Sequence, residues 1–282
     1  MNKIAVPQDY NYVGIFLTLS CNLSCHYCIN TLSGGLVKKK LIPHTDWIQL
    51  INRLKLPENL PITLQGGEPT IHPDFYKIIN GIESHIAIDL LTNAQFDPVK
   101  FASLISPSRL RRDADYASIR VSYHPTTMSW EKTLEKVVWL KEKGYSVSLN
   151  SVMHPEVATL LLACQKEASS KGIDFRFKEF LGVYKDEVYG QYKYANASFS
   201  DKLQSVSCKT SELLIAPDGQ FYRCHHDLYN AYKPLGSLLD ENIIISSAFS
   251  SCDKYGRCNP CDVKIKNNRF QEWGHTSVEI NF

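Results

Sequence analysis

Three cysteines lie within eight residues near the start of the chain, in the stretch SCNLSCHYCIN. Cys21, Cys25 and Cys28 form a Cys-x3-Cys-x2-Cys motif, and thiols spaced this closely are typical of metal ligation. Iron–sulfur clusters ordinarily take four cysteines. Three would hold three irons of a cubane cluster and leave the fourth iron open to a small molecule. Zinc is the alternative, because structural zinc also takes four ligands and His26 could be the fourth.

The other six cysteines are also unevenly placed, with one at 164 and five between 208 and 261. The total of nine is odd, and the chain shows no basic leader followed by an apolar segment and cleavage site. These features favour metal ligation over disulfides and predict a cytoplasmic protein. The net charge of +2 is too small to indicate binding to nucleic acid or to a membrane.

Short apolar runs alternate with amphipathic helical patterns over the first two thirds of the chain. The six strand candidates are 13–19, 61–65, 86–91, 117–122, 145–151 and 173–178. Six β-then-α units predict an α/β fold with a parallel sheet and right-handed crossovers. Their number favours a partial (β/α)6 barrel over a closed eight-fold one, which takes about 250 residues. Ligands bind at the carboxyl ends of such strands, and the cysteine loop follows the first strand directly.

The pattern changes after residue 181, which suggests a division of the chain into three parts. Residues 1–181 form the predicted core, 182–207 read as an irregular connection, and 208–282 read as a small cysteine-rich module. Within that module, Pro217-Asp218-Gly219 predicts the turn of a β-hairpin.

A second motif, QGGEP, follows the second predicted strand. Gly66 and Gly67 allow the backbone to approach a ligand closely, and Glu68 offers a carboxylate to a cationic amine. The cysteine loop after the first strand, together with Gly-Gly-Glu-Pro after the second, resembles the radical S-adenosylmethionine (SAM) superfamily. The resemblance extends over the order of elements from about residue 13 to 180.

The resemblance implies both a cofactor set and a chemistry. Cys21, Cys25 and Cys28 would ligate a 4Fe–4S cluster whose open iron chelates SAM. An electron donor such as flavodoxin or ferredoxin would reduce the cluster, and cleavage of SAM would give a 5′-deoxyadenosyl radical that abstracts a hydrogen atom from the substrate. The residues expected to contact SAM are Gly66, Gly67 and Glu68 at its amine, Tyr27 against its adenine, and Asn93, Ser122 and Asn150 at its ribose and methionine parts.

The C-terminal cysteines resemble the SPASM/twitch extension of radical SAM enzymes. Their spacing is Cys208-x10-Gly219-x4-Cys224 followed by Cys252-x5-Cys258-x2-Cys261. Five cysteines are too few for a full SPASM module, so the resemblance implies a twitch-like module with one auxiliary 4Fe–4S cluster. The expected ligands are Cys208, Cys224, Cys258 and Cys261, and a four-cysteine zinc site is the alternative. Cys252 is left over as a bystander, a replacement for one of the four, or a catalytic hydrogen-atom donor.

These observations predict an oxygen-sensitive enzyme that dehydrogenates or epimerises its substrate. The first strand begins near Val13 and leaves no room for a leader-binding domain, which favours a small molecule over a peptide. A peptide-modifying maturase is the alternative. A non-catalytic zinc or iron–sulfur binding module is a further one, but it does not explain the Gly-Gly-Glu-Pro motif.

Overall fold

The computed structural model describes residues 2–31, 39–111, 113–268 and 271–282. Its main feature is a nine-stranded sheet in the order β14-β13-β12-β2-β4-β5-β6-β7-β8. Six neighbouring parallel strands correspond to the six predicted ones: β2 (Tyr12–Thr18), β4 (Ile62–Gly66), β5 (Ile88–Thr92), β6 (Ile119–Ser122), β7 (Val147–Met153) and β8 (Phe175–Glu179). Because β14 and β8 stand at opposite ends, the sheet is open. The predicted α/β fold with a partial barrel is confirmed.

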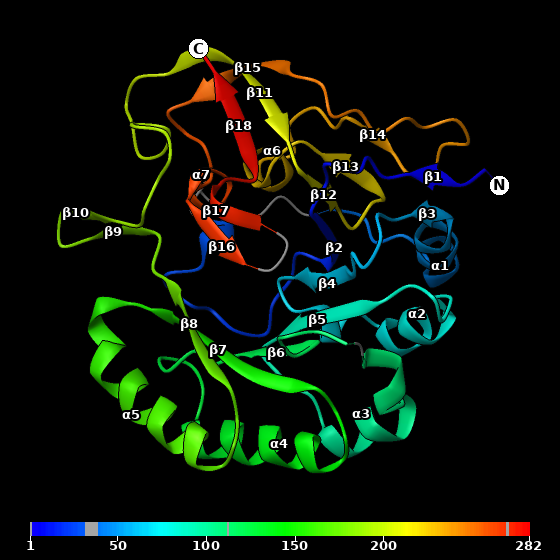
Figure 1. Ribbon diagram of the computed structural model, residues 1–282, viewed down its shortest axis with the longest axis vertical. Coiled ribbons are helices and arrows are strands. Elements are labelled where there is room, and N and C mark those ends of the chain that lie inside the picture. The colour runs from blue at the N-terminus through cyan, green and yellow to red at the C-terminus, as the bar shows by residue number, and fades with distance from the viewer. Residues whose placement is uncertain (1, 32–38, 112, 269–270) are drawn as a thin grey trace.

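Helices cover one face of this sheet, as Figure 1 shows for α3, α4 and α5 beneath β5–β8. They bury the alternate apolar residues of the strands, such as Val13, Ile15 and Leu17 of β2, all inaccessible to solvent. The helices are α1 (His44–Arg53), α2 (Phe75–Gly81), α3 (Pro98–Leu104), α4 (Trp130–Glu142), α5 (Ala158–Ser170), α6 (His225–Tyr229) and α7 (Pro260–Val263). None of the described helices is long and apolar enough to cross a membrane.

Side-chain caps set two of the helix boundaries. The Asp97 side chain accepts hydrogen bonds from the backbone N–H groups of Val99 and Lys100 and begins α3. Ser129 begins α4 in the same way, with Lys132 as the donor. The chain leaves α4 through Gly144, whose φ of +88° is a conformation that glycine adopts without strain.

The C-terminal region continues the barrel sheet. Strand β12 (Glu212–Ile215) pairs in parallel with β2, and the predicted turn at 217–219 connects it to β13 (Gln220–Tyr222). A separate three-stranded sheet has the order β15-β11-β18, with β11 at Gln204–Thr210, β15 at Ser250–Tyr255 and β18 at Val278–Asn281. The division at 181 and 208 therefore stays a prediction about folding units.

The remaining strands are short. The segment predicted as an irregular connection contains a hairpin, β9 (Gly182–Tyr184) with β10 (Glu187–Tyr189), and also the start of β11. Such short strands have too few residues to show a period of two. The others are β1 (Ile4–Ala5), β3 (Leu54–Lys55), β14 (Gly236–Ser237), β16 (Lys266–Asn268) and β17 (Gln271–His275).

A buried ion pair joins β12 to β16. Glu212 and Lys266 are 3% and 9% exposed, and their side chains are hydrogen-bonded. Burial alone would raise the pKa of Glu212, but the charges of Lys266 and then His225 lower it below its ordinary value. The Glu212 carboxylate therefore stays ionised, and its buried charge is stabilised chiefly by Lys266.

Replacing Lys266 by methionine is expected to lower the free energy of unfolding by about 3–5 kcal/mol, because a buried carboxylate loses its partner. Denaturant unfolding of the cofactor-loaded protein measures this loss. The double variant Glu212→Gln/Lys266→Met removes both charges and should recover much of it. A single variant as stable as wild type would show that the pair is dispensable.

Candidate functional site

The cysteine loop begins where β2 ends, at the carboxyl edge of the sheet. Cys21 is exposed and Cys25 and Cys28 are half-buried, so all three thiols can be reached by a ligand. Two backbone hydrogen bonds shape the loop, from the Cys28 N–H to the Cys25 carbonyl at 3.1 Å and from the Thr31 N–H to the Cys28 carbonyl at 3.0 Å. The loop therefore presents three thiols on a folded turn.

The Gly-Gly-Glu motif lies against the start of this loop. The N–H groups of Gly67 and Glu68 donate to the carbonyls of Thr18 at 3.0 Å and Ser20 at 2.9 Å. A Cβ atom on Gly66 would stand 2.0 Å from the Thr18 oxygen, and one on Gly67 would stand 2.1 Å from the Ser20 oxygen. Both glycines are thus required by the close contact between the two segments.

Replacing Gly67 by alanine is expected to displace the cysteine loop, since the clashing atoms are backbone and cannot rotate away. We expect a loss of about 1–3 kcal/mol in unfolding free energy, and reduced iron incorporation at the loop. Gly81→Ala is a matched control, because there the new methyl meets only the Ile48 side chain. Equal iron content in both variants would contradict the requirement.

Glu68 is buried, at 1% exposure. One carboxylate oxygen accepts hydrogen bonds from Thr70 and from the Thr92 hydroxyl, and the other accepts from the Asn93 N–H at 2.6 Å. Burial raises the pKa of this carboxyl above its ordinary value, although the hydrogen bonds oppose the shift. Glu68 thus connects its own turn to the end of β5, and its contact with SAM stays a prediction.

The three predicted residues on later strands lie at the same edge of the sheet. Asn93 follows β5, and its amide donates to Asn22 in the cysteine loop at 2.7 Å and lies 3.8 Å from the Cys21 sulfur. Ser122 ends β6 and pairs with Asn150 of β7. Asn150 is 7% exposed, and among the described residues its Nδ2 has no hydrogen-bond partner. A buried donor of this kind fits a site that a ligand completes.

Tyr27 contacts two histidines instead of open space. Its hydroxyl is 3.1 Å from Nδ1 of His124, and its ring stacks on His154 at a centroid distance of 5.4 Å. His154 is buried and also touches Phe180 and Tyr184. Nothing in the local sequence pattern indicates that these two histidines hold the tyrosine. The contact of Tyr27 with adenine stays a prediction.

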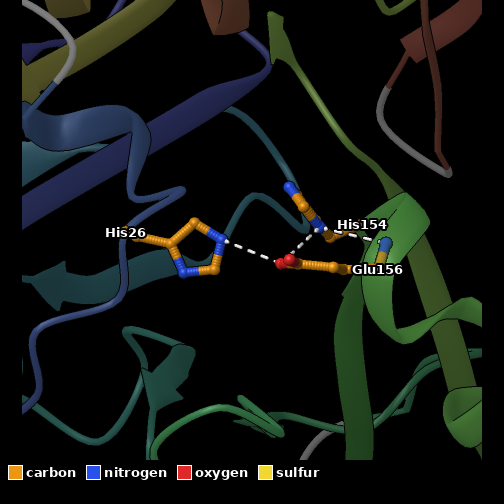
Figure 2. Close-up of side chains that lie close together, drawn as sticks. All are labelled: His26, His154 and Glu156. Carbon is orange, nitrogen blue, oxygen red and sulfur yellow. Dashed lines mark hydrogen bonds and ion pairs between the residues drawn. The ribbon is translucent and has the colours of Figure 1, made fainter. Parts of the chain in front are cut away.

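His26, His154 and Glu156 lie together beside the loop (Figure 2). In the described part of the chain they alone, among His, Cys, Asp and Glu, form a group of three with ligand atoms all within 4.8 Å. However, Nδ1 of His154 accepts the backbone N–H of Glu156, which occupies the lone pair that a metal would need. With Nδ1 occupied in this way, His154 cannot also donate from that atom to the Glu156 carboxylate 3.8 Å away, so the group fits neither a metal site nor a His154–Glu156 ion pair.

Four C-terminal cysteines line a small cavity. Its lining includes Cys208, Cys224, Cys252 and Cys258. Strand β15 runs antiparallel to β11 and places Cys252 opposite Val206, diagonally across from Cys208. Cys261, which belongs to the expected ligand set, is not part of this lining, whereas Cys252 is. Which of the five thiols hold a cluster stays a prediction.

Cys261 lies on α7 and does not line this cavity. It lies near groups of both parts of the chain, among them Lys178 of β8 and His225 and Lys266 of the C-terminal region. Asn259, two residues before Cys261, donates a hydrogen bond from its side chain to the Ile29 carbonyl at 3.2 Å. Helix α7 thus lies between the C-terminal cavity and the cysteine loop.

Charged side chains surround the C-terminal thiols. Arg223 lines the cavity and makes an ion pair with Asp227 at 2.9 Å. The pKa of Cys252 lies below its ordinary value, chiefly because of the neighbouring Cys208 thiol and to a smaller extent because of the Arg223 guanidinium. Asp262 accepts the backbone N–H groups of His225 and His226. A cation beside four thiols suits a ligand set that carries negative charge.

Comparison with known proteins agrees with this geometry. The family model of the radical SAM superfamily matches residues 15–158. Molybdenum cofactor biosynthesis protein 1 of Drosophila melanogaster is 23% identical over 266 residues, which cover 89% of this chain and 44% of that protein. GTP 3′,8-cyclase of Campylobacter jejuni is 25% identical over 224 residues, 75% of this chain and 67% of the cyclase. The chain thus spans less than half of the fly protein.

Solved structures show the same fold at low identity. The structure of anSMEcpe with bound AdoMet matches with a TM-score of 0.55 and 16% identity, over 81% of this chain and 78% of that one. SuiB of Streptococcus suis bound to S-adenosylmethionine matches with a TM-score of 0.50 and 15% identity, over 85% and 64%. Together with the family match over half of the chain, the cysteine loop and the Gly-Gly-Glu turn lead to one assignment: the chain belongs to the radical SAM superfamily.

Proposed function

We propose that Cys21, Cys25 and Cys28 hold a 4Fe–4S cluster and that Gly66, Gly67 and Glu68 help to bind SAM. The observation that carries this proposal is the pair of hydrogen bonds that join the Gly-Gly-Glu turn to the start of the cysteine loop. When bound, the cluster and SAM supply a 5′-deoxyadenosyl radical that abstracts a hydrogen atom from the substrate.

The protein's own residues would position these groups. Asn93 holds the cysteine loop through Asn22 and lies beside the Cys21 sulfur, so it orients one ligand. Asn150 offers a buried amide donor, and a bound molecule that accepts this hydrogen bond would remove the cost of leaving it unpaired, about 1–3 kcal/mol. Ser122, which pairs with Asn150, and Tyr27 would complete the SAM contacts.

We infer a second 4Fe–4S cluster in a twitch-like module, with Cys208, Cys224, Cys252 and Cys258 as its ligands. The cavity that these thiols share and the guanidinium of Arg223 beside them support the inference. Cys261 is left out of the proposed set because it does not line this cavity. Reduction would come from a partner protein such as a flavodoxin or ferredoxin.

For the reaction, dehydrogenation of a small molecule is the outcome that we favour over epimerisation. Cys252 is the thiol that could have returned a hydrogen atom to the substrate, and as a cluster ligand it is not free to do so. Cyclisation of a nucleotide is a second candidate, supported by the 25% identity to GTP 3′,8-cyclase over 224 residues. Peptide modification is a third, since solved neighbours include SuiB bound to precursor peptide SuiA.

The test is an anaerobic assay of the reconstituted protein with SAM and dithionite, in which 5′-deoxyadenosine is measured by mass spectrometry. We expect reductant-dependent formation of this product. A parallel sample with GTP tests the second candidate, which predicts a nucleotide product of the same mass as GTP. If no 5′-deoxyadenosine forms from protein that contains iron and sulfide, the proposed enzyme activity is wrong.

A further inference from the structure

Positively charged side chains converge on the inner face of the sheet, near the end of β8. Phe175 faces the core under α5, so the alternation of the strand directs Arg176 and Lys178 to the opposite face. Arg120 lies on the same face of β6. Arg120, together with Lys264 and Lys266 from the C-terminal region, lies near enough to Lys178 to lower the pKa of that lysine. These cations come from segments distant in sequence.

Three of these charges are neutralised within the protein. Arg120 makes an ion pair with Asp89 at 3.0 Å and Arg176 with Asp174 at 2.6 Å, and Lys266 pairs with the buried Glu212. Lys178 and Lys264, in contrast, make no ion pair with any carboxylate in the described segments. Within the described residues, Lys178 and Lys264 are therefore the two lysines of this inner face that have no carboxylate partner.

The surroundings of Lys178 disfavour the charged form of its side chain when no anion is bound beside it. Its side chain is open to solvent, yet the protein around it, and next the charge of Arg120, lower the pKa of Lys178 to about 8. Burial, and next the charge of Lys178, lower the pKa of His124 to about 4. Since His124 holds Tyr27 at the cysteine loop, Lys178 lies on the side of the sheet where the chemistry is expected.

We propose that Lys178 and Lys264 bind an anionic group of the substrate, a carboxylate or a phosphate. This inference rests on the proposed function, because it places the substrate at the same edge of the sheet as SAM. SAM itself has a carboxylate, but its predicted amine contacts lie on the turn after β4. Strand β8 is four strands away, or about 19 Å measured along the curved sheet at a strand spacing of about 4.8 Å. The substrate class is therefore an acid or a phosphorylated molecule.

The experiment measures anion binding to the full chain with its clusters reconstituted. Inorganic phosphate is followed by 31P NMR line broadening and acetate by 1H relaxation, at constant ionic strength, and the two probes distinguish the two kinds of anionic group. Lys178→Met and Lys264→Met are each expected to weaken binding of the preferred anion about tenfold or more, the effect of losing a charged hydrogen bond. Lys178→Arg keeps the charge and should retain binding. Lys166→Met is the control, as this exposed lysine lies on α5.

Three outcomes would overturn the proposal. Neither probe binding to wild type, or both binding equally well to wild type and to the two methionine variants, would show that the lysines hold no anion. A dissociation constant for SAM that rises in Lys178→Met as much as the constant for the anion would assign the site to the SAM carboxylate. Formation of 5′-deoxyadenosine by wild type, measured on the same samples, is independent of these outcomes. Its failure would contradict the proposed function and not the anion site.

Discussion

Replacing Cys21, Cys25 and Cys28 together by alanine is expected to abolish 5′-deoxyadenosine formation. The loop would then offer no thiolate to the cluster, while the rest of the fold keeps its buried core, because Cys21 is exposed and the other two are half-buried. Iron analysis should show a loss of about four irons per chain, which is one cubane cluster. The four C-terminal thiols are untouched, so about four irons should remain.

The control for this variant is Cys164→Ala. Cys164 is buried in α5 at 3% exposure and belongs to neither cysteine set. It should keep both its full iron content and its activity. A triple variant that lost all of its iron would mean that no cluster is held by the C-terminal cysteines. A triple variant that still cleaved SAM would refute the assignment of the loop.

Cys252→Ala and Cys261→Ala are expected to differ strongly, although the two residues lie nine positions apart in one short segment. Cys252 lines the cavity with Cys208, Cys224 and Cys258. Its loss should therefore remove or destabilise the auxiliary cluster, with a decrease of up to about four irons per chain. Cys261 does not line that cavity, and its replacement should leave the iron content unchanged.

Iron and sulfide analysis of the two variants, purified side by side without oxygen, decides between the ligand sets. The reverse result, with full iron in Cys252→Ala and a deficit in Cys261→Ala, would restore the set predicted from spacing. It would also return Cys252 to the role of a possible hydrogen-atom donor. Equal deficits in both variants would mean that the cavity alone does not define the ligands.

Local pattern was sufficient to predict the barrel. Each of the six parallel strands combines β-branched or aromatic residues with clear boundaries, and caps such as Asp97 and Ser129 mark helix starts within a few residues. The motif order then placed the cysteine loop and the Gly-Gly-Glu turn at one edge. Their direct hydrogen bonds followed from the parallel pairing of β2 and β4.

Long-range pairing explains what the sequence did not reveal. The grouping of Cys252 with Cys208 depends on the antiparallel contact of β15 with β11, between residues more than forty positions apart. No spacing rule within 252–261 reports this contact. The same holds for β12, which joins the barrel sheet beside β2 instead of remaining in a separate module.

The inner cations could have been found in part. The alternation Phe175, Arg176, Phe177, Lys178 shows that two charges share one face of β8. The sequence does not indicate that Lys264, from the C-terminal region, lies near this face and adds to its positive charge.

The most direct test of the account is metal analysis of anaerobically reconstituted wild type, combined with the SAM cleavage assay on the same sample. Two 4Fe–4S clusters predict about eight irons and eight sulfides per chain, no zinc, and 5′-deoxyadenosine when dithionite is present. Zinc in place of iron, with SAM left intact, would contradict the account at its centre, since the cysteine loop would then be a structural metal site.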